Sequence, residues 1–185
     1  MRLSFTAFFL FLFPTFVFSE PIKIISEIES KFSGSLVDTR DLSKCLFKTI
    51  KYAKCLPASG LVNEKNIISV RDLYWLFSVS DLDHEEKIIL FGNKPDDIKF
   101  VAGLLFLSGQ KNIYILDKNI SSLFETYPLG KGLKRKLFRI RAYKGKLRES
   151  FLDFESDSTP LEKKQDVIQF VESIIFERNI KKVGL

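Results

Sequence analysis

The residues best suited to covalent chemistry are two cysteines, Cys45 and Cys55, which are ten positions apart. They do not form a CxxC pair, so thioredoxin-type redox chemistry is not indicated. Together with the single histidine, His84, they are too few for a cysteine-based metal site, and no metal is expected. Three interpretations stay open: a structural disulfide, two buried free thiols, or a reactive thiol at Cys55 near Lys51 or Lys54.

A second candidate site is the loop that follows the apolar run 88–91. The loop consists of Gly92, Asn93, Lys94, Pro95, Asp96 and Asp97. A loop between a buried strand and a helix often holds a nucleophile or an anion, because its amides and the helix N-terminus carry positive partial charge. This loop contains no Cys, Ser or His. We expect Asp96 and Asp97 to cap the free amides at the start of the helix instead.

The elements that must position these residues follow from hydrophobic periodicity. Short apolar segments predict buried strands at 22–25, 35–38, 87–91 and 112–116. Helices are predicted at 26–32, 42–54, 70–79, 96–108 and 120–126. Ser26 and Glu29 have the spacing of a capping box for the first helix, and extended structure is expected after Pro57. Strands that are apolar on both faces and alternate with helices predict an α/β fold, with a parallel sheet covered on both faces.

The first nineteen residues predict an export signal. They contain one base, Arg2, and then an apolar stretch of about sixteen positions, with Ser19 where a signal peptidase prefers a small side chain. We expect cleavage after Ser19 and a periplasmic or secreted protein, in which the cysteine pair is permitted to oxidise. An uncleaved membrane anchor is the alternative, although the stretch is shorter than the ~20 residues that span a bilayer and Pro14 interrupts it.

The chain changes character after residue 127. Residues 131–148 contain nine Lys or Arg and no acid. This basic segment has two interpretations: a weak contact with an anionic membrane surface, or a solvated pair of strands whose bases face water or the acidic residues 153–157. Nucleic acid is not an expected partner of an exported protein. A final helix over about 160–178 has an apolar side and is expected to pack on the core.

Three segments of the chain resemble motifs of the rhodanese-like family. "LVDTRD" (36–41) is similar to the family's strand-end Asp-x-Arg pattern, and "CLPAS" (55–59) is similar to its His-Ile-Pro-Gly-Ala motif, with only the proline identical. "IILFG" and "GQKNIYILDKNI" match the strand, loop, helix and strand around the family's active site. The resemblance covers about residues 22–127. Together with the export signal, it divides the chain into an expected signal peptide at 1–19, a rhodanese-like domain at 20–127 and a C-terminal extension at 128–185.

The same resemblance indicates a lost activity. Rhodaneses carry a persulfide on a cysteine at a strand end, and Gly92 occupies that position here. Asp38 and Arg40 take the two charged positions of the family's pattern, where they are expected to brace the loops. The resemblance therefore implies a catalytically inactive module that binds an unknown protein partner and needs no cofactor. The alternative is a thiol-dependent sulfurtransferase or redox enzyme that uses Cys55 or Cys45.

Overall fold

The computed structural model describes residues 22–64, 66–136, 138, 140–148 and 163–183 of the 185-residue chain. The expected signal peptide at 1–19 and the acidic residues 153–157 lie outside these ranges. None of the helices within them is both long enough and apolar enough to cross a membrane.

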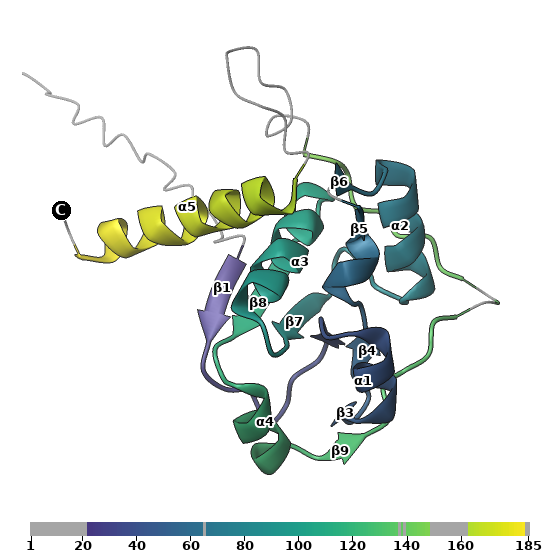
Figure 1. Ribbon diagram of the computed structural model, residues 1–185. Coiled ribbons are helices and arrows are strands. Elements are labelled where there is room, and N and C mark those ends of the chain that lie inside the picture. Colours follow the sequence, from purple (N-terminus) through teal and green to yellow (C-terminus); the bar gives the residue numbers. More distant parts are fainter. Residues whose placement is uncertain (1–21, 65, 137, 139, 149–162, 184–185) are drawn as a thin grey trace, which may run out of the picture.

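A five-stranded parallel sheet forms the centre of the protein (Figure 1). Its strands are β1 (Ile22–Ile25), β2 (Ser35–Asp38), β4 (Lys54–Cys55), β7 (Lys87–Phe91) and β8 (Asn112–Leu116). They lie in the order β1-β8-β7-β2-β4, and every neighbouring pair is parallel. The α/β fold and all four predicted strands are therefore confirmed, and β4 is an additional edge strand.

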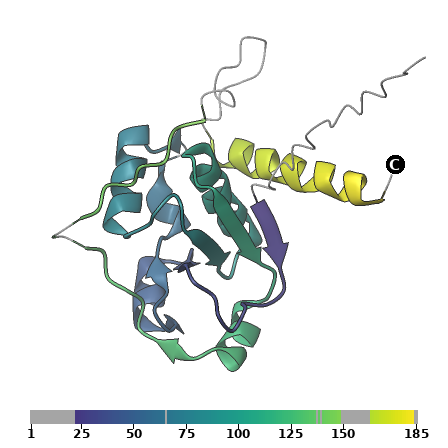
Figure 2. The same ribbon diagram turned by 180° about the vertical axis from the view of Figure 1, so that it is seen from behind.

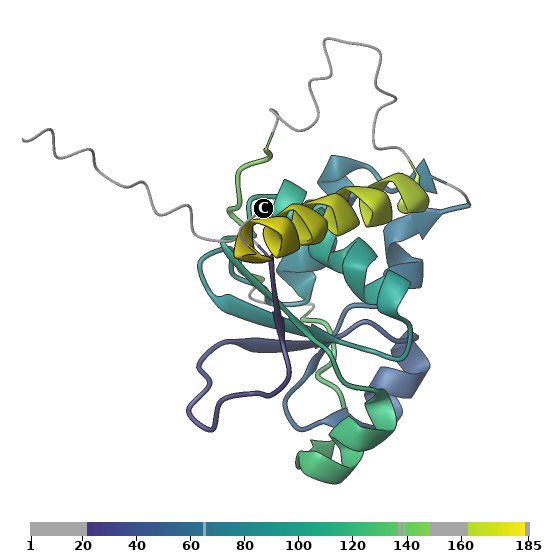
Figure 3. The same ribbon diagram turned by 90° about the vertical axis from the view of Figure 1, so that its left-hand side faces the viewer.

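Helices cover both faces of this sheet (Figure 3). The helices are α1 (Leu42–Phe47), α2 (Val70–Val79), α3 (Pro95–Leu107), α4 (Ile120–Thr126), α5 (Lys164–Val183) and a 3-10 helix, η1 (Ala58–Leu61). The main hydrophobic core joins α2, α3, α5 and η1 to one face, which carries Ile88 and Leu90 of β7. A smaller core under the opposite face joins α4 and the loop 26–34 to Ile89 and Phe91.

Two predicted helices are wrong in whole or in part. Residues 26–34 form bends and a turn, because Ile28 and Phe32 insert beneath the sheet and one short turn cannot offset the cost of helix nucleation. The helix predicted over 42–54 ends at Phe47. After it, β3 (Thr49–Ile50) pairs antiparallel with β9 (Leu129–Gly130), and β4 joins the sheet edge.

A second short ladder, β5 (Val62–Asn63) with β6 (Asn66–Ile67), follows η1. The residues directly after Pro57 are thus a 3-10 helix rather than the expected extended structure.

The basic segment does not form the expected pair of strands. Its described residues run along the domain, as the view from behind shows (Figure 2), and their amides bond to other elements. Leu133 N donates to Ala53 O over 2.8 Å, and Lys136 N donates to Val79 O over 2.8 Å. Tyr143 is buried in the main core, and burial raises the pKa of its hydroxyl. Tyr143 N also bonds to the domain, donating to Ser78 Oγ over 2.9 Å, so the described amides that are paired in this segment bond to other elements and not to one another.

The C-terminal helix α5 packs on α3, as the sequence predicts. Val167, Ile168 and Val171 are buried in the main core. A Cβ on Gly103 of α3 would lie 2.9 Å from Val171 Cγ2 and closer still to Val167 Cγ1. The absence of a side chain at Gly103 therefore sets the distance at which the two helices meet.

Candidate functional site

The end of β7 leads into the loop that the sequence predicts as a candidate site, and this loop begins with a residue that has no side chain. Gly92 follows directly after Phe91 and is buried. A Cβ built on it would collide with the hydroxyl of Thr39 and lie 3.5 Å from Ile98 Cγ1. The Thr39 hydroxyl and amide both donate to Phe91 O, over 3.2 and 3.0 Å. Thr39 therefore occupies the space that a side chain at position 92 would need.

Thr39 is a site residue that was not predicted from the sequence. The available signal was its place between Asp38 and Arg40 at the end of β2, because β2 and β7 are neighbours and their register pairs Asp38 with Phe91. Residues that follow directly after paired parallel strands meet at the same edge of the sheet.

The loop after Gly92 leads into α3 without the expected capping by aspartate. The N-cap residue is Lys94, which makes no side-chain capping bond, and Pro95 opens the helix. Pro95 has no amide hydrogen to satisfy, so one of the free donors is absent. Asp97 accepts from the ammonium of Lys164 on α5, and Asp96 is exposed. The capping expectation is thus wrong, and Asp97 ties the start of α3 to α5.

The strand-end pair Asp38 and Arg40 forms a buried network. Arg40 Nη2 donates to Asp38 Oδ2 over 2.7 Å and to Lys48 O over 2.6 Å. Thr49 Oγ1 donates to the same Asp38 oxygen over 2.7 Å. The Asp38 side chain is fully buried, and the guanidinium of Arg40 lies over the ring of Phe124 on α4. The pair therefore joins the ends of β2, α1 and α4, and its polar atoms are used within the domain.

The two cysteines are joined by a disulfide in the structure. Their Cα atoms are 5.9 Å apart and both residues are buried. Gly132 of the basic segment lies directly on the bridge: its amide donates to Cys45 O over 3.1 Å, and a Cβ there would collide with Cys55 Sγ. Within the described residues no cysteine is free, so thiol chemistry at Cys55 or Cys45 would first require reduction.

A pocket of about 360 Å³ opens beside Gly92, at the carboxyl ends of the strands. Its apolar lining comes from β1, β8, α3 and α5 and consists of Ile24, Pro95, Ile98, Ile115, Leu116 and Ile175. Its polar lining consists of Asn93, Lys99, Asp117, Lys118 and Asn119. Among the residues that the structure describes, none with a thiol, hydroxyl or imidazole lines the pocket. Nor does the described part of the chain hold a cluster of side chains that could bind a metal. The pocket suits a small apolar group better than a reacting anion.

Known proteins match this chain in structure only. No family model and no curated protein matches the sequence. Among solved structures, YnjE matches 65% of this chain at 19% identity with a TM-score of 0.53. A variant of EanB in complex with ergothioneine matches 70% at 9% identity with a TM-score of 0.54. A Rhodanese_3-like domain from Anabaena sp. is matched over 99% of its length at 19% identity, with a TM-score of 0.39 over 57% of this chain.

The aligned part of this chain spans 31% of the length of YnjE and 38% of the length of the EanB variant. Identities this low concern the arrangement of the backbone alone. Over the aligned residues, this chain therefore shares the arrangement of its backbone with YnjE and the EanB variant. The chain has a rhodanese-like fold.

Proposed function

We propose that this chain is an exported rhodanese-like module that transfers no sulfur and acts by binding. The observation that carries the proposal is the contact between Gly92 and Thr39. Sulfane transfer needs a thiolate at the strand end to attack the donor sulfur and hold the covalent intermediate. Position 92 has no side chain, and the Thr39 hydroxyl fills the space where one would begin.

The pocket beside Gly92 supports a binding role. It is open and mainly apolar, and it lies where α/β proteins bind ligands, outside the carboxyl ends of parallel strands. The atom that blocks a Cβ on Gly92 belongs to Thr39, which does not line the pocket, whereas Ile98, which does, lies at an ordinary contact distance of 3.5 Å. The pocket can therefore take an apolar group, such as a side chain of a partner protein, although the reactive position is closed.

Export is supported by the apolar start of the chain and by the Cys45–Cys55 bridge, because disulfides persist outside the cytosol. Mass spectrometry of the protein recovered from the exported fraction tests this part of the proposal. The expected mass is that of a chain beginning at Glu20. An intact amino terminus in all of the recovered protein would contradict it.

A sulfurtransferase assay with thiosulfate and cyanide tests the lack of activity. We expect no thiocyanate above the level of a Cys45→Ser/Cys55→Ser variant, whether or not the protein is first reduced. An active sulfurtransferase in the same buffer controls for the assay. Turnover by the reduced wild type above that of the double variant would favour the second candidate, an enzyme that uses Cys55 or Cys45.

A further inference from the structure

The bases of segment 131–148 do not form one charged surface, because they have different neighbours. Lys136 Nζ lies 2.7 Å from Asp81 Oδ2, and Arg141 Nη1 lies 2.8 Å from Asp83 Oδ2. All four side chains are at least partly exposed, but the charges are paired. The charges of Lys136 and Arg141 are thus neutralised by the loop after α2.

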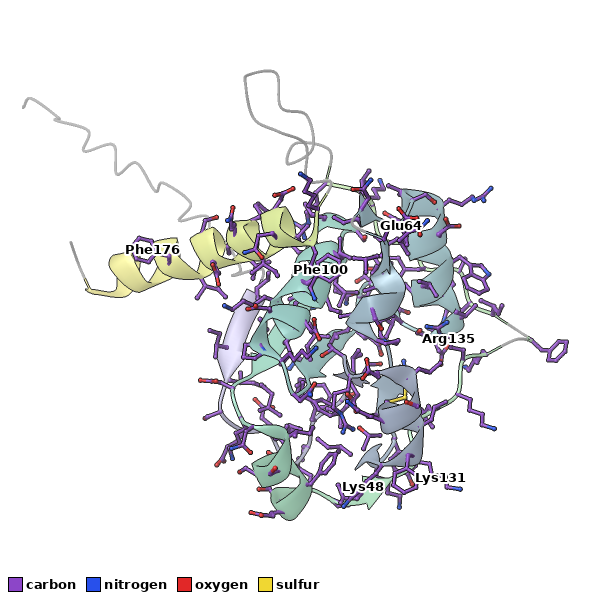
Figure 4. All side chains as sticks on the ribbon, viewed as in Figure 1. Lys48, Glu64, Phe100, Lys131, Arg135 and Phe176 are labelled. Carbon is purple, nitrogen blue, oxygen red and sulfur yellow. A yellow bond between two sulfur atoms is a disulfide. The ribbon has the colours of Figure 1, made fainter. Side chains whose placement is uncertain are left out.

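Lys131 lies in different surroundings, next to two more lysines. The register of β3 and β9 pairs Thr49 with Gly130, so Lys48 and Lys131 come opposite each other one position further on. Figure 4 shows both at the same end of the molecule. Lys51 follows directly after β3, and its Cα lies 3.5 Å from the position that a Cβ on Gly130 would take. Within the described ranges, none of these three lysines has a carboxylate at ion-pair distance.

Two exposed aromatic side chains flank these lysines. Phe47, the last residue of α1, is 81% exposed, and Tyr52 is 68% exposed. Lys51 Nζ lies 4.9 Å from the centre of the Tyr52 ring. Tyr52 has a φ of +68°, a backbone region that bulky residues rarely adopt. We call the surface made by Phe47, Lys48, Lys51, Tyr52 and Lys131 the β3–β9 face.

Acids contribute little to the charge of this face. The acids that precede it in the chain, Asp38 and Asp41, are paired with Arg40 and Lys44. The elements that pack on β3 are α1, α4 and β9. Among their described residues, Glu125 on α4 is the only acid, and the face keeps a positive net charge.

We propose that the β3–β9 face docks on an anionic lipid bilayer. Lysines near such a surface are attracted by the headgroup charge, and aromatic rings prefer the boundary between headgroups and acyl chains. The phenyl ring of Phe47 has no polar group to hold it in water, so a bilayer fits this face better than a soluble polyanion does. The face lies at the end of the molecule toward which the parallel strands point (Figure 1).

Co-sedimentation of the protein recovered from the exported fraction with vesicles tests this proposal. One set of vesicles is phosphatidylcholine, and the other is phosphatidylcholine and phosphatidylglycerol in equal parts. The exported form is used because the proposed cleavage after Ser19 removes the apolar amino terminus, which would bind both kinds of vesicle. We expect Lys48→Gln/Lys51→Gln/Lys131→Gln to weaken binding to anionic vesicles by about a hundredfold. The matched control, Lys136→Gln/Arg141→Gln/Lys144→Gln, removes the same charge elsewhere and should leave binding nearly unchanged.

The aromatic residues are tested separately, at a salt concentration that screens the lysines. We expect Phe47→Gln/Tyr52→Asn to weaken binding by about tenfold. Asparagine tolerates a positive φ, and urea unfolding shows whether each variant is folded. Equal loss in both lysine variants, or equal binding of the wild type to both kinds of vesicle, would overturn the proposal. It would also be overturned if soluble polyphosphate bound the face as strongly as vesicles did and the aromatic variant bound normally.

Discussion

The ends of the neighbouring strands β2 and β7 differ in the side chains that follow them. At the end of β2, Asp38 and Arg40 form a buried ion pair in which both carboxylate oxygens and the Nε and Nη2 of Arg40 are bonded within the domain. At the end of β7, Gly92 contributes no side chain, and the chain turns away into an exposed loop. Thr39 connects the two, because it follows Asp38 and bonds to Phe91 O. One edge of the sheet thus holds both a strand end fixed by a buried ion pair and a strand end that is followed by a residue without a side chain.

The largest expected effect is at the end of β2. Replacing Arg40 by Met leaves the fully buried Asp38 carboxylate without its cation, which is expected to lower the free energy of unfolding by about 3–5 kcal/mol. Urea denaturation measures the loss. A decrease below ~1 kcal/mol would show that the pair behaves like a surface ion pair and that the two strand ends do not differ in this respect.

The disulfide strengthens the same side of the sheet. Cys55 lies opposite Asp38 in the pairing of β2 with β4, and its bridge to Cys45 closes a short loop. In the chain-entropy model, reducing the wild type is expected to lower the free energy of unfolding by about 2–3 kcal/mol. The comparison is urea unfolding with and without reductant. A Cys45→Ala/Cys55→Ala variant is the control, because its midpoint should not respond to the reductant.

A smaller effect is expected at the end of β7. Gly92→Ala forces a methyl group against the Thr39 hydroxyl and should lower the free energy of unfolding by about 1–3 kcal/mol. A double-mutant cycle identifies the cause. The cost should fall in a Thr39→Ala background, which removes the obstructing atom, and persist with Thr39→Val, which keeps an atom there. Equal costs in both backgrounds would mean that another contact excludes a side chain at position 92.

The smallest effect is expected for the ion pair at the start of α3. Asp97 and Lys164 are 18% and 36% exposed, so solvent screens their interaction. Asp97→Asn should lower the free energy of unfolding by less than about 1 kcal/mol, far less than Arg40→Met. Urea unfolding of the two variants side by side gives the ratio. If both variants lost a similar free energy of unfolding, the buried ion pair at the end of β2 would not be stronger than the partly exposed ion pair after β7.

Much of the fold could be predicted because its signals are local. The runs 22–25, 87–91 and 112–116 are apolar on both faces, which identifies buried parallel strands without knowledge of their neighbours. Three segments illustrate the limit. Extended structure was expected after Pro57, where a 3-10 helix forms, and helices were expected over 26–32 and 42–54, where the first is absent and the second ends at Phe47. In each, contacts with distant segments such as β9 decided the outcome.

The sequence by itself determined that position 92 has no reactive side chain, that Asp38 and Arg40 follow a buried strand, and that the bases concentrate in 131–148. Only the tertiary structure decided that Thr39 fills the space at Gly92, that Gly132 covers the disulfide, and which bases have acidic neighbours. The physical reason is that a side chain's type is local, whereas its partners come from segments that the sheet brings together. Steric fit and charge neutralisation depend on those partners.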